Sequence, residues 1–166
     1  FESIWYSLVM KKTVAVLLHD IRSAHNVGSI FRTADALGVT HIYLSGYTPT
    51  PLDRFDRPRK DIAKVALGAE KTIPWHYEKN PQDIICDLRK KNYQIIALEQ
   101  TKKSVDYKKV KIKYPALCIV GNEVGGVSEE VLSLCDIVAE IPMAGDKESL
   151  NVSVAFGVGL FRILDK

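Results

Sequence analysis

The chain has 166 residues, 46% of them hydrophobic and 26% charged, which is typical of a globular protein large enough to bury a core of its own. Its formal net charge of +3 permits an anionic partner such as a nucleic acid but does not require one. No apolar run approaches the roughly 20 residues that a membrane-spanning helix needs, and residues 1–10 lack the pattern of a signal peptide.

The first residues read as an addition to a single domain. Met10 is followed by two lysines and then by the first apolar run, so we interpret residues 1–9 as an N-terminal extension and residues 10–166 as one domain. The cysteines and histidines show neither a CxxC pair nor metal-ligand spacing, so we expect no metal site and a reducing, cytoplasmic location. These residues are Cys86, Cys118, Cys135, His19, His25, His41 and His76.

The first apolar run, at residues 14–18, is a continuous series of β-branched and aliphatic side chains, which is typical of a buried parallel strand. A helical pattern follows from Asn26, which can cap the helix, and Gly38 comes directly after its last turn. The next strand is predicted at residues 41–45.

A polar stretch at residues 51–64 is rich in arginine, lysine and aspartate, and a short helix is expected to end near Gly68. A strand is predicted at residues 72–77. Asn80 and Pro81 then occupy the N-cap and first position of a helix, where these residue types are favoured.

The second half of the chain continues the alternation. Three further strands are predicted, at residues 93–98, 116–120 and 137–141. Residues 100–113 form a lysine-rich connection without a clear period, Ser128 caps a short helix, and the last helix is predicted at residues 149–164. Strands alternating with helices predict an α/β fold with a mainly parallel sheet and helices on both faces.

Three segments carry residues suited to chemistry, and the first runs from Asn26 to Arg32. A turn from strand to helix leaves free N–H groups that attract anions, and Asn26 and Arg32 would face the same ligand region. The alternative is a helix cap followed by a solvated arginine.

The second segment, Gly121–Gly126, follows a predicted strand. It is not GxGxxG and contains no lysine, which disfavours an NAD or ATP phosphate site. Its glycines let the backbone approach a ligand closely, and Glu123 suits a cation or a hydroxyl-rich ligand. The alternative is an ordinary turn between strand and helix.

The third segment runs from Ile141 to the start of the last helix. Its apolar side chains, Ile141, Met143 and Leu150, could enclose a flat ring such as adenine, with Ser149 and Asn151 at the polar end. The alternative is an N-cap followed by a core helix.

The order and spacing of the three segments resemble the SpoU/TrmH family of RNA ribose methyltransferases, which belongs to the SPOUT class. The matching motifs are Asn26-x-Gly28-x-x-x-Arg32, Gly121-Asn122-Glu123-x-Gly125-Gly126, and Ile141-Pro142-Met143 with Ser149-Leu150-Asn151-Val152-Ser153-Val154-Ala155. The segment Leu67-Gly68-Ala69-Glu70 also resembles the family, and the resemblance extends from Val14 to Leu164.

The resemblance implies a C-terminal trefoil knot, S-adenosylmethionine as cofactor, and a homodimer with its active site at the subunit interface. It implies an enzyme that methylates a ribose 2′-hydroxyl of tRNA or rRNA. The catalytic residues would be Arg32, Asn26, Glu123, Ser149 and Asn151. The cofactor would contact Leu98, Gln100, Gly121, Asn122, Gly126, Ile141, Met143 and Leu150.

The RNA would be held by basic side chains, for which the sequence offers Arg22, Arg54, Arg57, Arg59 and Lys60, with Lys102, Lys103, Lys108 and Lys109 as further candidates. We expect no separate RNA-binding domain. Two other interpretations stay open: an RNA-binding module with an inactive site, and an unrelated small-molecule enzyme that uses a nucleotide.

Overall fold

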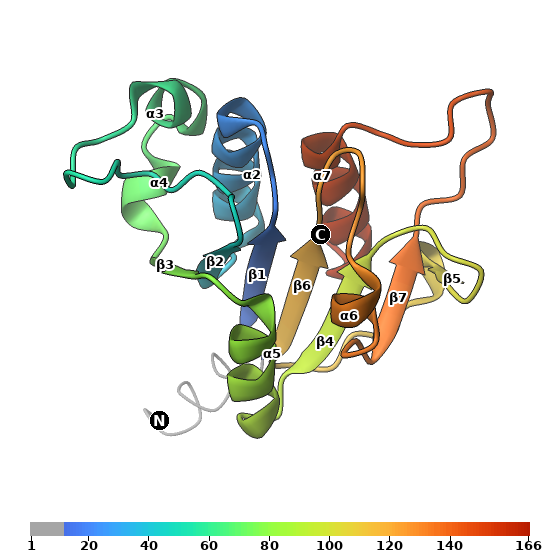
Figure 1. Ribbon diagram of the computed structural model, residues 1–166. Helices are drawn as coiled ribbons and strands as arrows, with labels where there is room; N and C mark the ends of the chain where they lie inside the picture. The colour runs from blue at the N-terminus through green and yellow to red at the C-terminus, as the bar shows by residue number, and fades with distance from the viewer. Residues whose placement is uncertain (1–11) are drawn as a thin grey trace.

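The computed structural model describes residues 12–166, and the interpretation of residues 1–9 as an extension lies outside them. Within the described residues, seven strands form one sheet in the order β3-β2-β1-β6-β4-β7-β5, and every pair is parallel (Figure 1). The strands are β1 (Val14–His19), β2 (His41–Ser45), β3 (Trp75–Glu78), β4 (Gln94–Leu98), β5 (Val105–Asp106), β6 (Ala116–Val120) and β7 (Ile137–Glu140).

Helices cover both faces of this sheet. Figure 1 shows α5 and α6 on the face opposite to α2 and α7. The helices are α2 (Ala24–Leu37), α3 (Lys60–Ala66), α4 (Ala69–Thr72), α5 (Pro81–Lys90), α6 (Glu129–Leu132) and α7 (Val152–Ile163), with a 3-10 turn, η1, at Tyr107–Lys109. The predicted α/β fold class is confirmed, because the sheet is parallel and helices lie on both of its faces. Parallel strands that are neighbours in a sheet need a crossover connection, which the helices supply.

The central strands β1 and β6 are apolar at every position except His19, because each face of the sheet is buried. In β1, Val14, Val16 and Leu18 pack in the core cluster beneath α2 and α7, whereas Ala15 and Leu17 pack in the cluster beneath α5 and α6. Every residue of β1 and of β6 is buried. The continuous apolar runs therefore predicted these strands correctly.

The expected cap of α2 was wrong. The helix begins two residues earlier than Asn26, at Ala24, and Ser23 is its N-cap, with its hydroxyl accepting a hydrogen bond from the Asn26 N–H at 3.2 Å. Because Ser23 takes the capping role, the Asn26 side chain is buried and free to make other contacts. Gly38 does end the helix, with a φ of 72°.

Three other boundaries differ from the expectation. Residues 72–77 do not form one strand, because α4 occupies Ala69–Thr72 and β3 begins at Trp75. The lysine-rich connection contains the short edge strand β5, which pairs with β7. The last helix begins at Val152 rather than Ser149, because the Asn151 side chain caps it by accepting from the Ser153 N–H at 2.9 Å. Among residues 12–166, no helix is long and apolar enough to cross a membrane.

Candidate active site

A cavity of about 250 Å3 lies at the carboxyl ends of β4, β6 and β7. The crevice beyond the carboxyl ends of parallel strands is where α/β proteins bind ligands. All eight residues expected to contact a cofactor line this cavity, and so do Glu123 and Ser149. The eight are Leu98, Gln100, Gly121, Asn122, Gly126, Ile141, Met143 and Leu150.

The loop after β6 forms one wall of the cavity and folds back on itself. The Asn122 N–H donates to the Gly126 carbonyl at 3.0 Å, and the Gly126 N–H donates to the Asn122 carbonyl at 2.9 Å. The Asn122 side-chain oxygen also accepts from the N–H groups of Val124 and Gly125. Asn122 thus fixes the turn from inside while its amide nitrogen donates to the Asp20 carbonyl at 3.0 Å.

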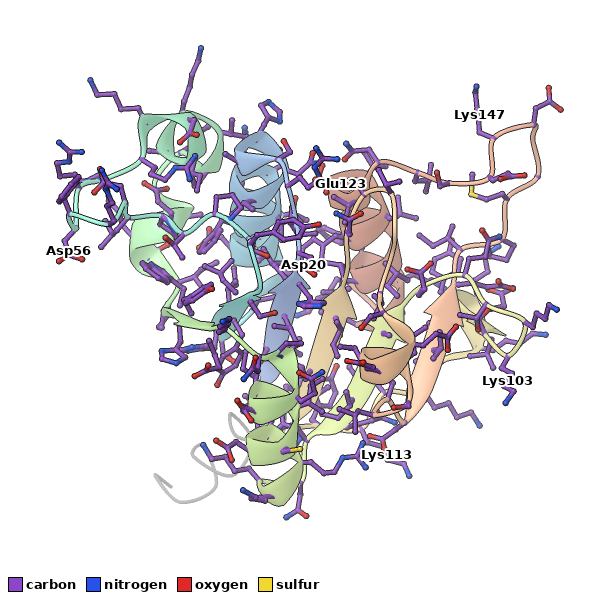
Figure 2. The ribbon with its side chains drawn as sticks, in the orientation of Figure 1. Asp20, Asp56, Lys103, Lys113, Glu123 and Lys147 are labelled. Atoms are coloured by element: carbon purple, nitrogen blue, oxygen red, sulfur yellow. The ribbon has the colours of Figure 1, made fainter. Side chains whose placement is uncertain are left out.

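Glu123 joins this loop to the start of α2, and Figure 2 shows it above the end of β6, beside α2. Its carboxylate accepts three hydrogen bonds, from the backbone N–H groups of Arg22 at 3.0 Å and Ser23 at 3.1 Å and from the Asn26 amide at 2.9 Å. Partial burial alone would raise the pKa of Glu123, but these hydrogen bonds stabilise the ionised form and hold the pKa below its ordinary value. Glu123 is therefore a fixed carboxylate at neutral pH.

Asn26 connects Glu123 to the start of α7. Its side-chain oxygen accepts from the Asn151 amide at 3.1 Å, while its amide nitrogen donates to Glu123. Asn151 in turn caps α7, with its oxygen accepting from the N–H and the hydroxyl of Ser153. One chain of hydrogen bonds, Glu123–Asn26–Asn151, thus joins the three segments that the sequence singled out.

Arg32 does not line this cavity within one chain, contrary to the expectation that it would face the same region as Asn26. Six residues turn a helix by about 600°, which leaves Arg32 roughly 120° around α2 from Asn26. Its exposed side chain lines a separate hollow of about 340 Å3, together with Asp35 and residues 66–69 and 72.

The sequence did not single out the other carboxylates of the cavity, Glu99, Glu140 and Glu148. Glu99 follows β4 directly, and its carboxylate accepts from the N–H groups of Val127 at 2.8 Å and Gln100 at 2.7 Å. It packs so closely on Gly126, whose φ is +66°, that a side chain at position 126 would collide with it. Its place at the end of a predicted strand was the signal that could have identified it.

The predicted RNA-binding residues lie outside the cavity. Arg54, Arg57 and Arg59 line a groove along the loop that joins β2 to α3, and Lys60 begins α3. Arg57 and Arg59 are already paired with Asp53 and Asp61. The exposed side chain of Arg22 lies just before α2. In the part of the chain that the structure describes, no cluster of three or more histidine, cysteine or acidic side chains could hold a metal ion.

Comparison with known proteins places these features in a family. Residues 13–161 match the model of the SpoU rRNA Methylase family. The chain is 31% identical to the tRNA (guanosine(18)-2'-O)-methyltransferase of Aquifex aeolicus over 91% of this chain and 68% of that enzyme. It is 34% identical to the 23S rRNA (guanosine-2'-O-)-methyltransferase RlmB of Ralstonia nicotianae over 88% of this chain and 56% of that one.

The comparison with solved structures points to the same kind of protein as these relatives. The crystal structure of an AdoMet-bound rRNA methyltransferase from Sinorhizobium meliloti superposes with a TM-score of 0.83 at 31% identity, covering 92% of this chain and 56% of that one. The chain thus spans little more than half the length of the two rRNA enzymes.

Proposed function

Because the chain belongs to the SpoU rRNA methylase family, we propose that it transfers a methyl group from S-adenosylmethionine to a ribose 2′-hydroxyl of tRNA or rRNA. The observation that carries the proposal is the convergence of the three signature segments, through Glu123, Asn26 and Asn151, beside one cavity at the carboxyl ends of the strands. A cytoplasmic location is part of this proposal. Family membership also implies the C-terminal trefoil knot.

The chemistry of the cavity fits S-adenosylmethionine. The cofactor carries a positive sulfonium and a positive ammonium group, and four carboxylates line the cavity, those of Glu99, Glu123, Glu140 and Glu148. None of the lining residues is a lysine or an arginine, so a polyphosphate nucleotide would meet only like charge. Leu98, Ile141 and Leu150 would supply apolar contacts to the adenine ring.

The residues of this chain must bring a ribose hydroxyl to the cofactor, which supplies a methyl group already activated by its sulfonium. Holding two reactants in line lowers a barrier by up to roughly 7–11 kcal/mol, so positioning is the main task of the protein. Glu123 has a lowered pKa and accepts three hydrogen bonds, so it acts as a positioning residue rather than as a base. The guanidinium group of Arg32 suits a phosphate next to the reacting ribose.

We further propose that two copies of the chain form the active enzyme. Three apolar side chains on one face of α7 are exposed, Val154, Val158 and Phe161, at 49%, 42% and 40%. Their spacing of four and three residues makes a continuous stripe that a second copy can cover. Because Arg32 lies outside the cavity of its own chain, the partner subunit's Arg32 would complete the site.

Transfer of a labelled methyl group tests this function. The chain is incubated with labelled S-adenosylmethionine and either small RNA or ribosomal RNA, and the methylated riboses are mapped. We expect label on a ribose 2′-oxygen of one RNA class. Cofactor binding without transfer to any RNA would instead favour the inactive RNA-binding module, and tight binding of NAD or ATP would favour a different enzyme.

The variant Arg32→Ala separates catalysis from cofactor binding. The rate of methyl transfer should fall by at least about a hundredfold, because the variant loses the contact that would hold the RNA phosphate and so misplaces the ribose. Affinity for S-adenosylmethionine, measured by calorimetry, should stay within about twofold, since Arg32 does not line the cavity. Lys90→Ala, which removes an exposed cation on α5, is the control, and near wild-type transfer by Arg32→Ala would refute the assignment.

A further inference from the structure

A groove of about 680 Å3 follows the loop between β2 and α3, outside the cofactor cavity. Its lining includes three aromatic and three cationic side chains: Tyr47, Phe55, Tyr77, Arg54, Arg57 and Arg59. Grooves that combine positive charge with aromatic faces bind single-stranded nucleic acids, because the bases stack on the rings while the cations follow the backbone.

Phe55 is the most unusual member of this groove. Its side chain is 59% exposed, so it contributes little to the core. The guanidinium carbons of Arg54 and Arg57 lie over its ring, at 4.7 and 4.9 Å from the ring centre. A large aromatic ring kept at the surface in contact with two cations is the kind of side chain on which a flat ligand can stack once a cation moves aside.

The loop holds Phe55 in a fixed position. The Asp53 carboxylate accepts from the N–H groups of Phe55 at 2.8 Å and Arg57 at 3.1 Å, and Leu52 pairs with Pro58 across the turn. Asp56, next to Phe55 in the chain, lies at the outer end of the loop (Figure 2). Because the backbone that carries the ring is already ordered, little loop entropy is lost when a ligand stacks on it.

The two arginines beside the ring differ in how they are held. Arg57 is tied to Asp53, with distances of 2.9 Å from Nε and 2.7 Å from its terminal nitrogen. Within residues 12–166, Arg54 contacts Phe55 and has no carboxylate at ion-pair distance. Arg54 can therefore leave the ring to bind a phosphate, and its departure frees a face of Phe55.

The groove is connected to the cofactor cavity. The Asn122 amide, in the loop that lines the cavity, donates to the Tyr47 hydroxyl at 2.6 Å. Within the groove, the Tyr77 hydroxyl donates to the Gly46 carbonyl at 2.7 Å. A strand of RNA in the groove would thus lie against the same loop that bounds the cavity.

We propose that Phe55 is a stacking site for an unpaired base of the RNA substrate, and that Arg54 moves from the ring to a neighbouring phosphate when the base arrives. The proposal rests on the proposed function, since it names the form of the RNA that the site accepts: a single-stranded or unpaired segment close to the methylated ribose.

The test compares two probes with the full chain in the presence of S-adenosylmethionine. One probe is a strand of about ten uridines, and the other is a strand of the same length whose riboses lack bases. Fluorescence anisotropy gives both affinities. We expect the wild type to prefer the strand with bases by at least about fivefold, the lower end of what one stacked base contributes.

Phe55→Ala and Phe55→Leu should both abolish this preference, because neither side chain has an aromatic face. Arg54→Gln should weaken binding of the strand with bases more than binding of the strand without them, because Arg54 reaches a phosphate only when a base takes its place on the ring. Val105→Ala, at an exposed apolar residue of β5 outside the groove, is the matched control and should keep the preference. Since Phe55 is exposed, the variants should fold and keep their affinity for S-adenosylmethionine.

Two results would overturn the stacking site: equal affinity of the wild type for the two strands, or a preference that survives in Phe55→Ala or Phe55→Leu. Either result leaves methyl transfer and cofactor binding untouched, so the proposed function is judged separately by its own assay.

Discussion

Asn26 and Glu123 show how single residues can serve structure and site together. Asn26 is buried, and both polar atoms of its side-chain amide form hydrogen bonds with residues that are distant in the sequence, Glu123 and Asn151. Removing either partner would leave a buried polar group unpaired, which costs about 1–3 kcal/mol. The site residues therefore hold three distant segments in register as well as bounding the cavity.

The lowered pKa of Glu123 predicts how stability depends on pH. A carboxyl group whose pKa is lower in the folded chain stabilises the fold fully above its unfolded pKa of about 4.3, and that contribution is lost as the pH falls through the lower folded value. Glu123→Gln should reduce the free energy of unfolding at pH 7 by about 1–3 kcal/mol. The difference from wild type should shrink below about pH 4.

Urea unfolding at neutral and acid pH measures both quantities. Glu129→Gln is the control, because Glu129 lies exposed in the first turn of α6 and should change stability by only a few tenths of a kcal/mol, about 0.5 at most. Equal stability of Glu123→Gln and wild type at pH 7 would contradict the prediction.

Among the elements, α2 and α3 approach each other unusually closely at Gly28. A Cβ atom at this position would lie 2.7 Å from the Ile62 carbonyl oxygen and 2.9 Å from the Val65 Cβ. Alanine is favoured over glycine in a helix by about 1 kcal/mol, but the clash should outweigh this gain and make Gly28→Ala less stable by about 1–3 kcal/mol.

Gly157→Ala is the matched control, since a Cβ atom there meets only the Thr33 methyl at an ordinary 3.5 Å. It should be neutral or stabilising by up to about 1 kcal/mol in urea unfolding. If the two variants changed stability alike, the contact between α2 and α3 would not be the reason for glycine at position 28. The Gly28 of the first motif is thus explained by helix packing.

The sequence predicted elements well where a local pattern determines them. The apolar runs of β1, β4 and β6 are buried on both faces, and such runs are recognisable without knowing their neighbours. The strand β5, in contrast, has two residues and exists only because β7 lies beside it. Pairing of this kind depends on tertiary structure and leaves no periodic signal.

The candidate site shows the same division. Spacing identified the glycine loop after β6, because this loop is a local feature, whereas it put the start of α7 at Ser149 instead of Val152. Ser23 and Asn26 are both good capping residues, so the sequence could not decide which one caps α2. The roles of Glu99 and Tyr47 depend on Val127 and Asn122, which reach them from distant parts of the chain.

For the whole molecule, the exposed stripe on α7 predicts a dimer that Val158→Glu should break. A buried carboxylate without a partner is costly, so this variant should sediment as a monomer while the wild type sediments as a dimer. The monomer should bind S-adenosylmethionine but transfer no methyl group, because its cavity lacks an arginine from a second chain.

Mixed dimers test whether Arg32 acts across the interface. Arg32→Ala chains are co-expressed with Gly126→Val chains, in which the new side chain would collide with Glu99 and block the cavity. If the arginine acts across the interface, one site of each mixed dimer has an open cavity and an intact arginine, so transfer should return. Inactive mixed dimers, or a fully active monomer of Val158→Glu, would show that each chain acts alone.

The position of β6 has a consequence for how the chain acquires its shape. This strand lies between β1 and β4, which both precede it, and Val14 pairs with Ala116. The strands β1 and β4 are therefore not connected through the sheet until residue 120 has joined them, and β4 and β5 are connected only by the still later β7. Contacts so distant along the chain close slowly, so we expect folding on the time scale of milliseconds to seconds. During synthesis, β1 and β4 would keep unpaired edges until β6 has left the ribosome.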